Sequence, residues 1–392
     1  MILSRKHLNR LSTIRRTAEK DSTRKPLEPF CDIETMTDQE DLKALRRRID
    51  QIDDQLLELI NERVSTAVRI GADKATRGEA VYRPEREAEI FRRLLECNEG
   101  PVSDEGVRTI FTEIVSCARS AEAPIRVAAL GPRGTFSEQA VYKVFGKQIT
   151  LVEAGSIKEV FRLTEVGDAQ FGVVPIENSS EGGVNATLDL LVDTPLQVCN
   201  EVELRVKHCL LSSARQDKPQ KIAGHEQALA QCRNWLLAHY PQATLVPKTS
   251  TAEAARSAAK NPGTMAVASA EAAALYGLEV IARDIADVSG NTTRFQVLAK
   301  SSSPRTGSDK TSLVAASSDD AGSLLQLLAP LAEARISMTR IESRPTRSGL
   351  WKYLFFIDLE GHAEDPQVRQ ALADIDKASS FLRVLGSYPQ AS

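Results

Sequence analysis

The first part of the sequence carries apolar residues at steps of three and four positions, from Leu42 to Ala67. This spacing places them on one face of a helix, over a stretch much longer than an average helix. Pro84 opens a second amphipathic segment, because proline favours the first turn of a helix. A third apolar face runs from Val107 to Ala118. The pattern predicts an all-α domain over residues 37–124.

Residues 125–302 have a different sequence pattern, in which short segments rich in β-forming residues alternate with helical segments. This alternation indicates an α/β domain with a largely parallel sheet, and its length favours two lobes. Ligands in such folds bind at loops beyond the strand ends. The clearest expected strands are Ile125–Leu130, Phe171–Val174, Val198–Val206, Met265–Ala268 and Phe295–Leu298, and the expected helices include Phe136–Phe145, Glu226–His239 and Thr251–Ala259.

Residues 310–390 follow a Ser-rich stretch, Ser301–Ser308, which predicts a flexible linker. Beyond it the pattern gives strand, helix, strand, strand, helix and strand. This βαββαβ order is typical of the ferredoxin-like fold. Such a module more often binds a ligand or a partner than carries an active site.

Composition agrees with a multidomain protein, because 392 residues are too many for one core. The net charge of −3 argues against binding to nucleic acid or to an anionic membrane. No apolar run reaches the roughly 18 residues that suggest a membrane-spanning helix. The six cysteines form no CxxC pair and no metal-like pattern with the histidines. We therefore expect buried, reduced thiols, no metal and a cytoplasmic protein.

The N-terminal residues 1–36 form a basic tail, with eight Lys or Arg against two acids in the first 25 residues. Such a segment is compatible with an organelle transit peptide or a flexible arm. It is also compatible with translation that starts at Met36. We expect a disordered tail without a catalytic role.

Four basic residues of the helical domain are candidates for binding an anion: Arg46, Arg63, Lys74 and Arg86. Arg63 and Lys74 are 11 residues apart, so they share a helix face at a distance of about 16 Å. Arg46 precedes Arg63 by 17 residues, about 25 Å along a continuous helix. If Arg46 contacts the same small ligand, it must come from another subunit, so we expect a homodimer or a higher homo-oligomer. For any one of these residues alone, a solvated surface charge is the simpler interpretation.

The helical segment resembles the all-helical chorismate mutases. The motifs that carry the resemblance are Asp41-Leu42-Lys43-Ala44-Leu45-Arg46, Asn61-Glu62-Arg63-Val64, Gly71-Ala72-Asp73-Lys74 and Tyr82-Arg83-Pro84-Glu85-Arg86-Glu87. The resemblance implies that Arg46, Arg63 and Arg86 hold the carboxylates of chorismate. It also implies that Lys74 donates to the ether oxygen and that Glu87 binds the substrate hydroxyl.

Two positions depart from that family pattern. Arg83 stands where some members carry an acid, so it counts here as a substrate-binding candidate. Glu122 stands where some members carry Gln. A carboxylate cannot donate a hydrogen bond to an ether oxygen, whereas a protonated Glu can. We therefore predict that Glu122 works in its protonated form.

The α/β segment resembles prephenate dehydratases through four motifs in order. They are Gly131-Pro132-Arg133-Gly134-Thr135-Phe136-Ser137, Val174-Pro175-Ile176-Glu177-Asn178-Ser179-Ser180, His225-Glu226-Gln227-Ala228-Leu229-Ala230-Gln231 and Thr292-Thr293-Arg294-Phe295. The glycine-rich loop lies between a strand and a helix, where its amides could face an anion. The resemblance implies a two-lobed fold like that of periplasmic binding proteins. It assigns catalysis to Thr293, Asn178 and Gln231, and substrate binding to Arg294, Ser179 and Ser180. Gly224 departs from relatives that often have Ser there.

The C-terminal segment resembles the amino-acid-binding ACT domain of prephenate dehydratases. The residues that carry this resemblance, and that it implies bind phenylalanine, are Gly322, Ser323, Leu324, Glu342, Ser343, Arg344 and Pro345. The three resemblances together imply a phenylalanine-inhibited enzyme that converts chorismate to prephenate and prephenate to phenylpyruvate, without a cofactor. Two alternatives remain open. The second site could act on arogenate, or the protein could be a phenylalanine-binding regulator with inactive catalytic domains.

Overall fold

The computed structural model describes residues 40–77, 81–214, 219–317, 320–345 and 353–390. The chain divides into two units, residues 1–57 and 58–392. The boundary falls within the first helix, α1 (Glu40–Arg77). The predicted basic tail, residues 1–36, lies outside the described residues.

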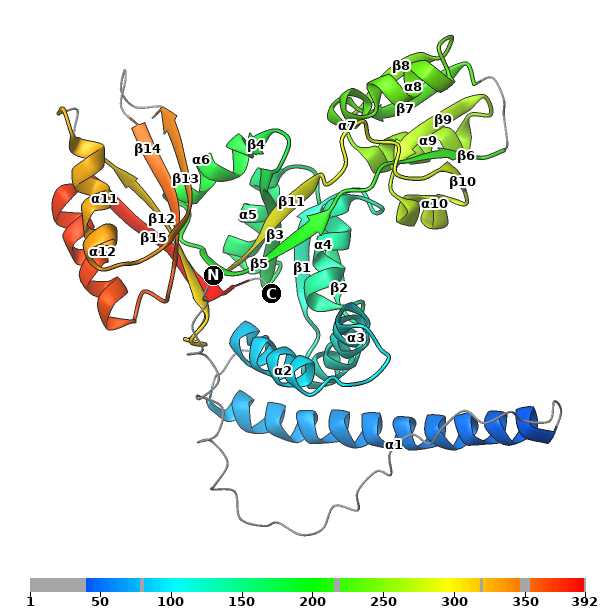
Figure 1. The fold of residues 1–392 in the computed structure, drawn as a ribbon, viewed down its shortest axis with the longest axis horizontal. Helices are drawn as coiled ribbons and strands as arrows, with labels where there is room; N and C mark the ends of the chain where they lie inside the picture. The colour runs from blue at the N-terminus through cyan, green and yellow to red at the C-terminus, as the bar shows by residue number, and fades with distance from the viewer. Residues whose placement is uncertain (1–39, 78–80, 215–218, 318–319, 346–352, 391–392) are drawn as a thin grey trace, which may run out of the picture. The chain divides into compact units, whose positions relative to one another are not determined.

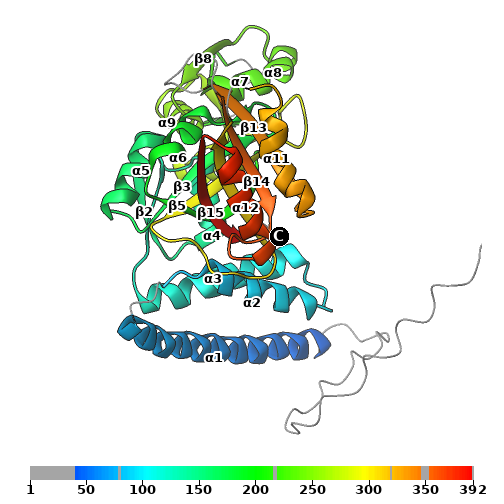
Figure 2. The same ribbon diagram turned by 90° about the vertical axis from the view of Figure 1, so that its left-hand side faces the viewer.

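The helical part comprises α1, α2 (Pro84–Glu96) and α3 (Asp104–Glu122), and α2 and α3 run side by side (Figure 2). Pro84 occupies the first turn of α2, as predicted. Ser103 caps α3, because its hydroxyl accepts a hydrogen bond from the amide of Gly106 at 3.1 Å. Gly71 lies inside α1, near its C-terminal end, and glycine within a helix weakens it by roughly 1 kcal/mol. A Cβ at this position would lie 2.6 Å from the Cγ of Glu122, so Gly71 leaves room for that side chain.

The α/β part has two lobes, each built on its own sheet (Figure 1). In the described residues, the first sheet has the order β2-β1-β3-β11-β5, with β4 paired to β3, and the second has the order β10-β6-β9-β7-β8. The strands of the first sheet are β1 (Arg126–Leu130), β2 (Thr150–Ala154), β3 (Phe171–Asn178), β4 (Gly182–Gly183), β5 (Gln197–Arg205) and β11 (Thr292–Ala299). Those of the second are β6 (Cys209–Ser212), β7 (Lys221–His225), β8 (Thr244–Lys248), β9 (Thr264–Ala268) and β10 (Glu279–Ala282).

Both sheets are mixed, so the prediction of a largely parallel sheet is wrong. The chain leaves the first lobe after β5 and returns in β11, and β11 pairs antiparallel with both β3 and β5. In the second lobe, β6 pairs antiparallel with β9 and β10. The strands that enter and leave each lobe therefore run against the parallel βαβ units. The two lobes themselves agree with the predicted fold class.

Helices cover both sheets. They are α4 (Phe136–Phe145), α5 (Ile157–Val166) and α6 (Asn185–Asp193) in the first lobe, and α7 (Glu226–Gln231), α8 (Arg233–His239), α9 (Thr251–Lys260) and α10 (Ala270–Tyr276) in the second. The helix predicted over Glu226–His239 is in fact two helices. Cys232 separates them with φ −111° and ψ 10°, outside the helical range.

The C-terminal part is a βαββαβ unit with the sheet order β13-β14-β12-β15. Helices α11 and α12 lie next to each other on one face of this sheet (Figure 1). Its elements are β12 (Asp309–Ala316), α11 (Ser323–Glu333), β13 (Met338–Pro345), β14 (Tyr353–Glu360), α12 (Pro366–Ala378) and β15 (Phe381–Pro389). On the opposite face, Val314, Phe356 and Tyr388 join the buried core of the first lobe. The ferredoxin-like prediction is confirmed.

The segment Ser301–Ser308, predicted as a flexible linker, is instead packed against the α/β part and the C-terminal part. Ser303 is buried, and its hydroxyl donates to the carbonyl of Cys199 at 2.6 Å. The carbonyl of Ser303 lies 3.0 Å from Nε2 of His362. The linker therefore belongs to the packed boundary between the α/β part and the C-terminal part.

The described cysteines are free thiols. Cys199, Cys209 and Cys232 are buried, whereas Cys97 and Cys117 are exposed, which corrects the expectation that the thiols are buried. Among the described helices, none has both the length and the apolar composition needed to cross a membrane.

Candidate active sites

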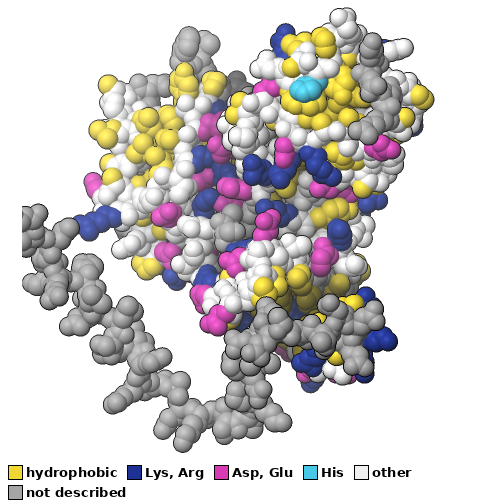
Figure 3. Space-filling view, turned by 45° about the vertical axis from the view of Figure 1, so that its right-hand side comes forward, with side chains coloured by type: hydrophobic (Ala, Val, Ile, Leu, Met, Phe, Trp, Pro, Cys, Tyr) yellow, Lys and Arg dark blue, Asp and Glu magenta, His cyan; other side chains and the backbone are white. Residues whose placement is uncertain are grey.

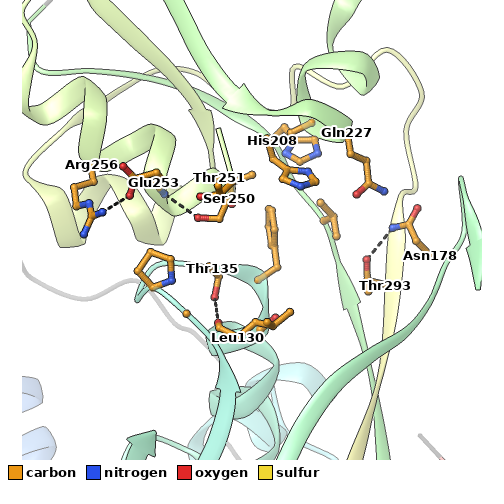
Figure 4. A pocket seen from close by; sticks show the side chains of 18 of the residues that line it. Leu130, Thr135, Asn178, His208, Gln227, Ser250, Thr251, Glu253, Arg256 and Thr293 are labelled. Atoms are coloured by element: carbon orange, nitrogen blue, oxygen red, sulfur yellow. Dashed lines mark hydrogen bonds and ion pairs between the residues drawn. The ribbon is translucent and has the colours of Figure 1, made fainter. Parts of the chain in front are cut away.

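A cavity of about 560 Å³ lies between the two lobes of the α/β part. We call it the lobe pocket. Figure 4 shows Thr293 and Asn178, from the adjacent strands β11 and β3, on one side. Ser250 and Thr251, at the start of α9, lie on the other. The lining also includes Thr135, Ser137, Glu153, His208, His225, Gln227, Gln231, Glu253, Arg256 and Asn291.

The three predicted catalytic residues of this domain all line the lobe pocket and belong to one hydrogen-bonded chain. Nδ2 of Asn178 lies 2.8 Å from Oγ1 of Thr293 and 2.8 Å from Oδ1 of Asn291. Nδ2 of Asn291 lies 2.9 Å from Oε1 of Gln231, and the same oxygen lies 2.9 Å from Nε2 of His208. The chain runs from Thr293 through Asn178, Asn291 and Gln231 to His208.

The direction of these hydrogen bonds follows from one backbone amide. The N–H of Ser180 donates to Oδ1 of Asn178 at 3.0 Å, which identifies that atom as the oxygen. The amide nitrogen of Asn178 must therefore donate to Thr293, whose own O–H hydrogen stays available for a ligand. By the same logic Asn291 donates to Gln231. The oxygen of Gln231 then requires the hydrogen on Nε2 of His208.

The imidazole of His208 is buried, and burial favours its neutral form. Burial lowers the pKa of its imidazole, and His225 lowers it further, while the hydrogen bond to Gln231 raises it. Among the described residues, Nδ1 of His208 and Nε2 of Gln231 have no hydrogen-bond partner. The lobe pocket thus contains one buried acceptor and one buried donor that a ligand could satisfy.

The glycine-rich loop contributes to the lobe pocket in a different way from that expected. The amide of Gly134 donates to the carboxylate of Glu138 on the following helix, so it is already occupied. Thr135 caps α4 and donates its hydroxyl to the carbonyl of Leu130 at 3.0 Å (Figure 4). On the opposite side, Arg256 is paired with Glu253.

The structure places Ser179, Ser180 and Arg294 outside the lining of the lobe pocket. The hydroxyl of Ser179 accepts from the amide of Thr292 at 3.0 Å, which fixes the start of β11. Ser180 acts on the pocket through its backbone amide, as described above. Its side chain lines a smaller neighbouring cavity with Gln231 and Asn291.

Arg294 is buried among carboxylates, so the prediction that it anchors a substrate carboxylate does not match its surroundings. Its guanidinium lies 2.7 Å from Asp358, 2.9 Å from Glu177 and 3.0 Å from Glu201. Burial alone lowers the pKa of Arg294, but Asp358 and Glu201 more than offset this and hold the pKa above its usual value. Asp358 belongs to β14, so Arg294 joins the α/β part to the C-terminal part.

A second cavity, of about 600 Å³, lies within the helical part of the second unit. We call it the helical pocket. The predicted residues that line it are Arg63, Lys74, Arg83, Arg86, Glu87 and Glu122. Arg119 also lines it, together with Glu62, Thr66 and apolar side chains such as Leu59, Ile70 and Val115. Arg46 lies in the first unit, where its side chain is exposed.

Burial perturbs two charged groups of the helical pocket. It raises the pKa of Glu87 to about 7, and Arg119 is the strongest of the neighbours that oppose this rise. Arg63 and Lys74 also oppose it, whereas Glu85 adds to it. Burial lowers the pKa of Arg63, and Glu87 opposes that shift. A carboxyl with a pKa near 7 can exchange its proton at physiological pH.

The remaining charged groups of the helical pocket form local pairs. Nζ of Lys74 lies 3.4 Å from Oε2 of Glu122, and both side chains are largely buried. Arg86 pairs with Glu89 one turn further along α2, and both side chains are exposed. Arg83 pairs with Glu85.

Two of the predicted effector residues, Glu342 and Arg344, lie against the α/β part. Arg344 contacts Asp189 at 2.7 Å and the carbonyl of Asn185 at 2.9 Å. The carboxylate of Glu342 pairs with Arg340 and lies against Gly183. Gly322 precedes α11 with φ +86°, which favours glycine, and Ser323 is buried at the start of that helix. Leu324, Ser343 and Pro345 are exposed.

No group of His, Cys, Asp or Glu side chains in the described part of the chain is arranged to hold a metal ion. On the face drawn in Figure 3, Lys and Arg side chains lie among Asp and Glu side chains.

Among the residues that line the two pockets, sequence reasoning missed Arg119, His208 and Asn291. Asn291 directly precedes the Thr292-Thr293-Arg294 motif, so proximity along the chain could have identified it. His208 follows the strand that leaves the first lobe, and Arg119 occupies a helix that reads as amphipathic. For both residues, the neighbouring sequence contains no motif that predicts a position in a pocket.

Comparisons with known proteins agree over nearly the whole chain. Residues 45–123 match the family described as chorismate mutase type II, residues 127–303 match prephenate dehydratase, and residues 311–377 match the ACT domain. A bifunctional chorismate mutase/prephenate dehydratase of Pseudomonas aeruginosa is 43% identical, over 91% of this chain and 100% of the relative. One of Neisseria gonorrhoeae is 45% identical, over 88% of this chain and 96% of the relative.

A solved structure adds a comparison in three dimensions. It is a prephenate dehydratase of Arthrobacter aurescens in complex with L-Phe, with 36% identity and a TM-score of 0.63. The match covers 68% of this chain and 90% of the other.

Proposed function

This chain belongs to the family of bifunctional chorismate mutase/prephenate dehydratases, and we propose how its residues divide the two reactions. Its helical part is a chorismate mutase, and its α/β part is a prephenate dehydratase. The observation that carries the assignment of residues is the contrast between a pocket rich in cations and a pocket rich in hydroxyls and amides.

In the mutase reaction the C–O bond of the enolpyruvyl ether breaks while a C–C bond forms, without a nucleophile. Catalysis requires a fixed reactive conformer and stabilisation of the negative charge on the ether oxygen. We assign the carboxylates of chorismate to Arg63 and Arg86. Lys74 and Glu122 donate hydrogen bonds to the ether oxygen. Glu87 accepts a hydrogen bond from the substrate hydroxyl. Arg83 contributes positive charge at the rim.

In the dehydratase reaction prephenate loses its ring carboxylate as carbon dioxide and its ring hydroxyl as water, and the ring becomes aromatic. The free hydrogen of Thr293 donates to the leaving hydroxyl, and Asn178 holds Thr293 in that orientation. A threonine hydroxyl is a weak acid, so Thr293 polarises the leaving group and passes on a proton. Nε2 of Gln231 and Nδ1 of His208 are available to polar groups of the substrate.

A coupled assay tests the two activities. Chorismate supplied to the full chain is expected to yield phenylpyruvate, detected by its enolate absorbance. Prephenate and arogenate supplied separately distinguish the substrate of the second site. Conversion of arogenate alone would contradict the proposal, and so would absence of turnover with all three compounds.

We propose that the protein is a homodimer or a higher homo-oligomer, in which Arg46 completes the helical pocket of another copy. The first unit carries an exposed apolar face with Leu42, Leu45, Ile49, Ile52 and Leu56. Such a face on a charged helix is typical of an interface between subunits. Sedimentation equilibrium tests the assembly. Activity restored by mixing an Arg46→Ala chain with an Arg63→Ala chain would support a shared site, because mixed dimers contain one intact pocket.

We further propose that phenylalanine is the effector and binds at the ACT motif, where it favours a weakly active state of the dehydratase. The support is the resemblance to the L-Phe complex together with the match to the ACT domain. Equilibrium dialysis of the full chain with labelled phenylalanine tests binding. We place the enzyme in the cytoplasm, because its described cysteines are free thiols.

A further inference from the structure

Arg119 occupies a position between the two catalytic domains. It extends from α3 of the mutase domain, and only 4% of its surface is exposed. Its Nη1 lies 2.9 Å from Oε1 of Glu87 in the helical pocket, an ion pair that lacks hydrogen-bond geometry. Its Nη2 donates to the carbonyl of Phe145 at 2.6 Å, in the dehydratase domain.

The contact with Phe145 is at the carboxyl end of α4. The last carbonyls of a helix have no partner within the helix, and the helix dipole makes that end negative. The guanidinium of Arg119 satisfies one of these carbonyls, and it also lies over the rings of Tyr82 and Phe145, at 5.2 and 5.6 Å from their centroids. The dehydratase domain thus fixes the position of the positive charge next to Glu87.

The approach of the two domains at this point depends on a glycine. Gly146 follows α4 with φ +64°, and a Cβ there would lie 2.5 Å from the Cβ of Ser116 on α3. The hydroxyl of Ser116 accepts a hydrogen bond from the amide of Gln148 at 3.0 Å. These contacts hold α3 against the end of α4, within reach of Arg119.

Several charged groups surround the carboxyl of Glu87. Arg63 and Lys74 approach it from α1, Glu85 from α2 and Arg119 from α3, and Tyr82 lies before α2. Arg63 and Lys74 also have to serve the substrate, and Lys74 is paired with Glu122. Arg119 differs from these two cations because it also contacts the dehydratase domain, at the carbonyl of Phe145.

We propose that Arg119 is a positioning residue of the mutase site, whose charge favours ionised Glu87, and that the dehydratase domain anchors Arg119 through the carbonyl of Phe145. The inference rests on the proposed role of Glu87 as the acceptor of the substrate hydroxyl. It makes the helical pocket dependent on the neighbouring domain, although no dehydratase residue lines that pocket in the described part of the chain.

The pH dependence of the mutase reaction tests this role in the full chain. If ionised Glu87 is required, mutase kcat/KM falls as the pH decreases through the pKa of Glu87, which is about 7. An opposite charge in contact lowers the pKa of a carboxyl by about 1 to 3 units. Arg119→Met is therefore expected to move this acidic limb upward by about 1 to 3 pH units. Arg119→Lys should move the acidic limb less than Arg119→Met, because lysine keeps the positive charge but lacks the guanidinium group.

Three further variants separate the possible outcomes. Glu87→Gln is expected to remove the acidic limb, and Arg119→Met added to it should change the profile no further. Arg108→Met is the matched control, because Arg108 is on the same helix, lies over the ring of Phe91 at 5.7 Å and does not line the pocket. Gly146→Ala separates α3 from α4 and should shift the limb in the same direction as Arg119→Met, by a smaller amount.

Dehydratase turnover of each variant, measured on prephenate, reports whether the chain is folded. If Glu87→Gln keeps the acidic limb, the proposed role of Glu87 is wrong. If Glu87→Gln removes the limb while neither Arg119→Met nor Gly146→Ala shifts it, the role of Arg119 is wrong. If Arg119→Met does not fold, the shift in Gly146→Ala decides.

Discussion

The two pockets that we propose as the sites of the two reactions differ in their lining. The helical pocket is lined with charged side chains, of which Arg63 and Lys74 are partly buried and Arg119 is buried. The lobe pocket presents Thr293, Asn178 and Gln231 in one chain of neutral groups, and its lining cation Arg256 is already paired with Glu253.

The reactions explain this difference. The mutase rearrangement develops negative charge on one ether oxygen, so fixed positive charges lower its barrier. The dehydratase reaction is driven by aromatisation, and the protein mainly has to help one hydroxyl leave. A well-oriented hydrogen-bond donor is sufficient for that step. We infer that charge is used where it stabilises the transition state, and not simply where an anion binds.

The largest effect is expected for Thr293→Ala. The loss of the donor to the leaving group should lower dehydratase kcat by about 10² to 10⁴-fold. Mutase turnover, measured as chorismate consumption by the same preparation, should stay unchanged. Substantial dehydratase turnover in this variant would refute the role of Thr293.

Lys74→Met should produce the opposite selectivity. Removal of the donor to the ether oxygen is expected to lower mutase kcat by about 10² to 10³-fold, while prephenate turnover is unaffected. A variant of the exposed Arg86 partner, Glu89→Gln, provides a control for changes of charge near the pocket. An equal loss of both activities in Lys74→Met would indicate a structural defect instead.

Glu122→Gln should change mutase activity and leave the dehydratase unaffected. The carboxyl of Glu122 lies 3.4 Å from Nζ of Lys74 at the place proposed for the ether oxygen. Gln donates a hydrogen bond without needing a bound proton, so mutase kcat of the variant, measured at pH 7 on chorismate, should rise. A mutase kcat that stays the same or falls in Glu122→Gln would exclude the proposed role.

Ionic strength should have the smallest effect and should distinguish the pockets directly. Salt screens charges, with a Debye length that falls from about 30 Å at 0.01 M to about 8 Å at 0.15 M. We expect KM for chorismate to rise with salt more than KM for prephenate. Initial rates in a potassium chloride series measure both, and equal sensitivities would contradict the contrast between the pockets.

The fold was largely predictable because hydrophobic periodicity records which face of each element is buried. The three helices and the βαββαβ unit follow from that pattern. Strand direction does not, since it depends on where the chain crosses between lobes, and β11 shows this through its two antiparallel neighbours. The break at Cys232 was missed because neither Gly nor Pro marks it.

The candidate sites were predictable to a different degree. The resemblance to prephenate dehydratases assigned Arg294 to substrate binding, next to Thr293 in the same motif. Adjacent residues of a strand, however, point to opposite faces of the sheet, so the two side chains cannot both face the lobe pocket. Arg119 could not be found from the sequence. Its partner is a backbone carbonyl, 26 residues away, which any amino acid could supply.

The carboxylate cluster around Arg294 has a consequence for the exchange of domains between relatives. Arg294 contacts Asp358 of the ACT domain, and Glu201 of the dehydratase domain is shared between Arg294 and Lys310 of the ACT domain. A transplanted ACT domain without an acid at position 358 would leave a buried cation partly uncompensated, which typically destabilises a protein by about 3 to 5 kcal/mol. Functional chimaeras should therefore be those in which the residues at positions 201, 294 and 358 come from the same parent protein. Recombination within this family is thus constrained by charge at a buried domain boundary.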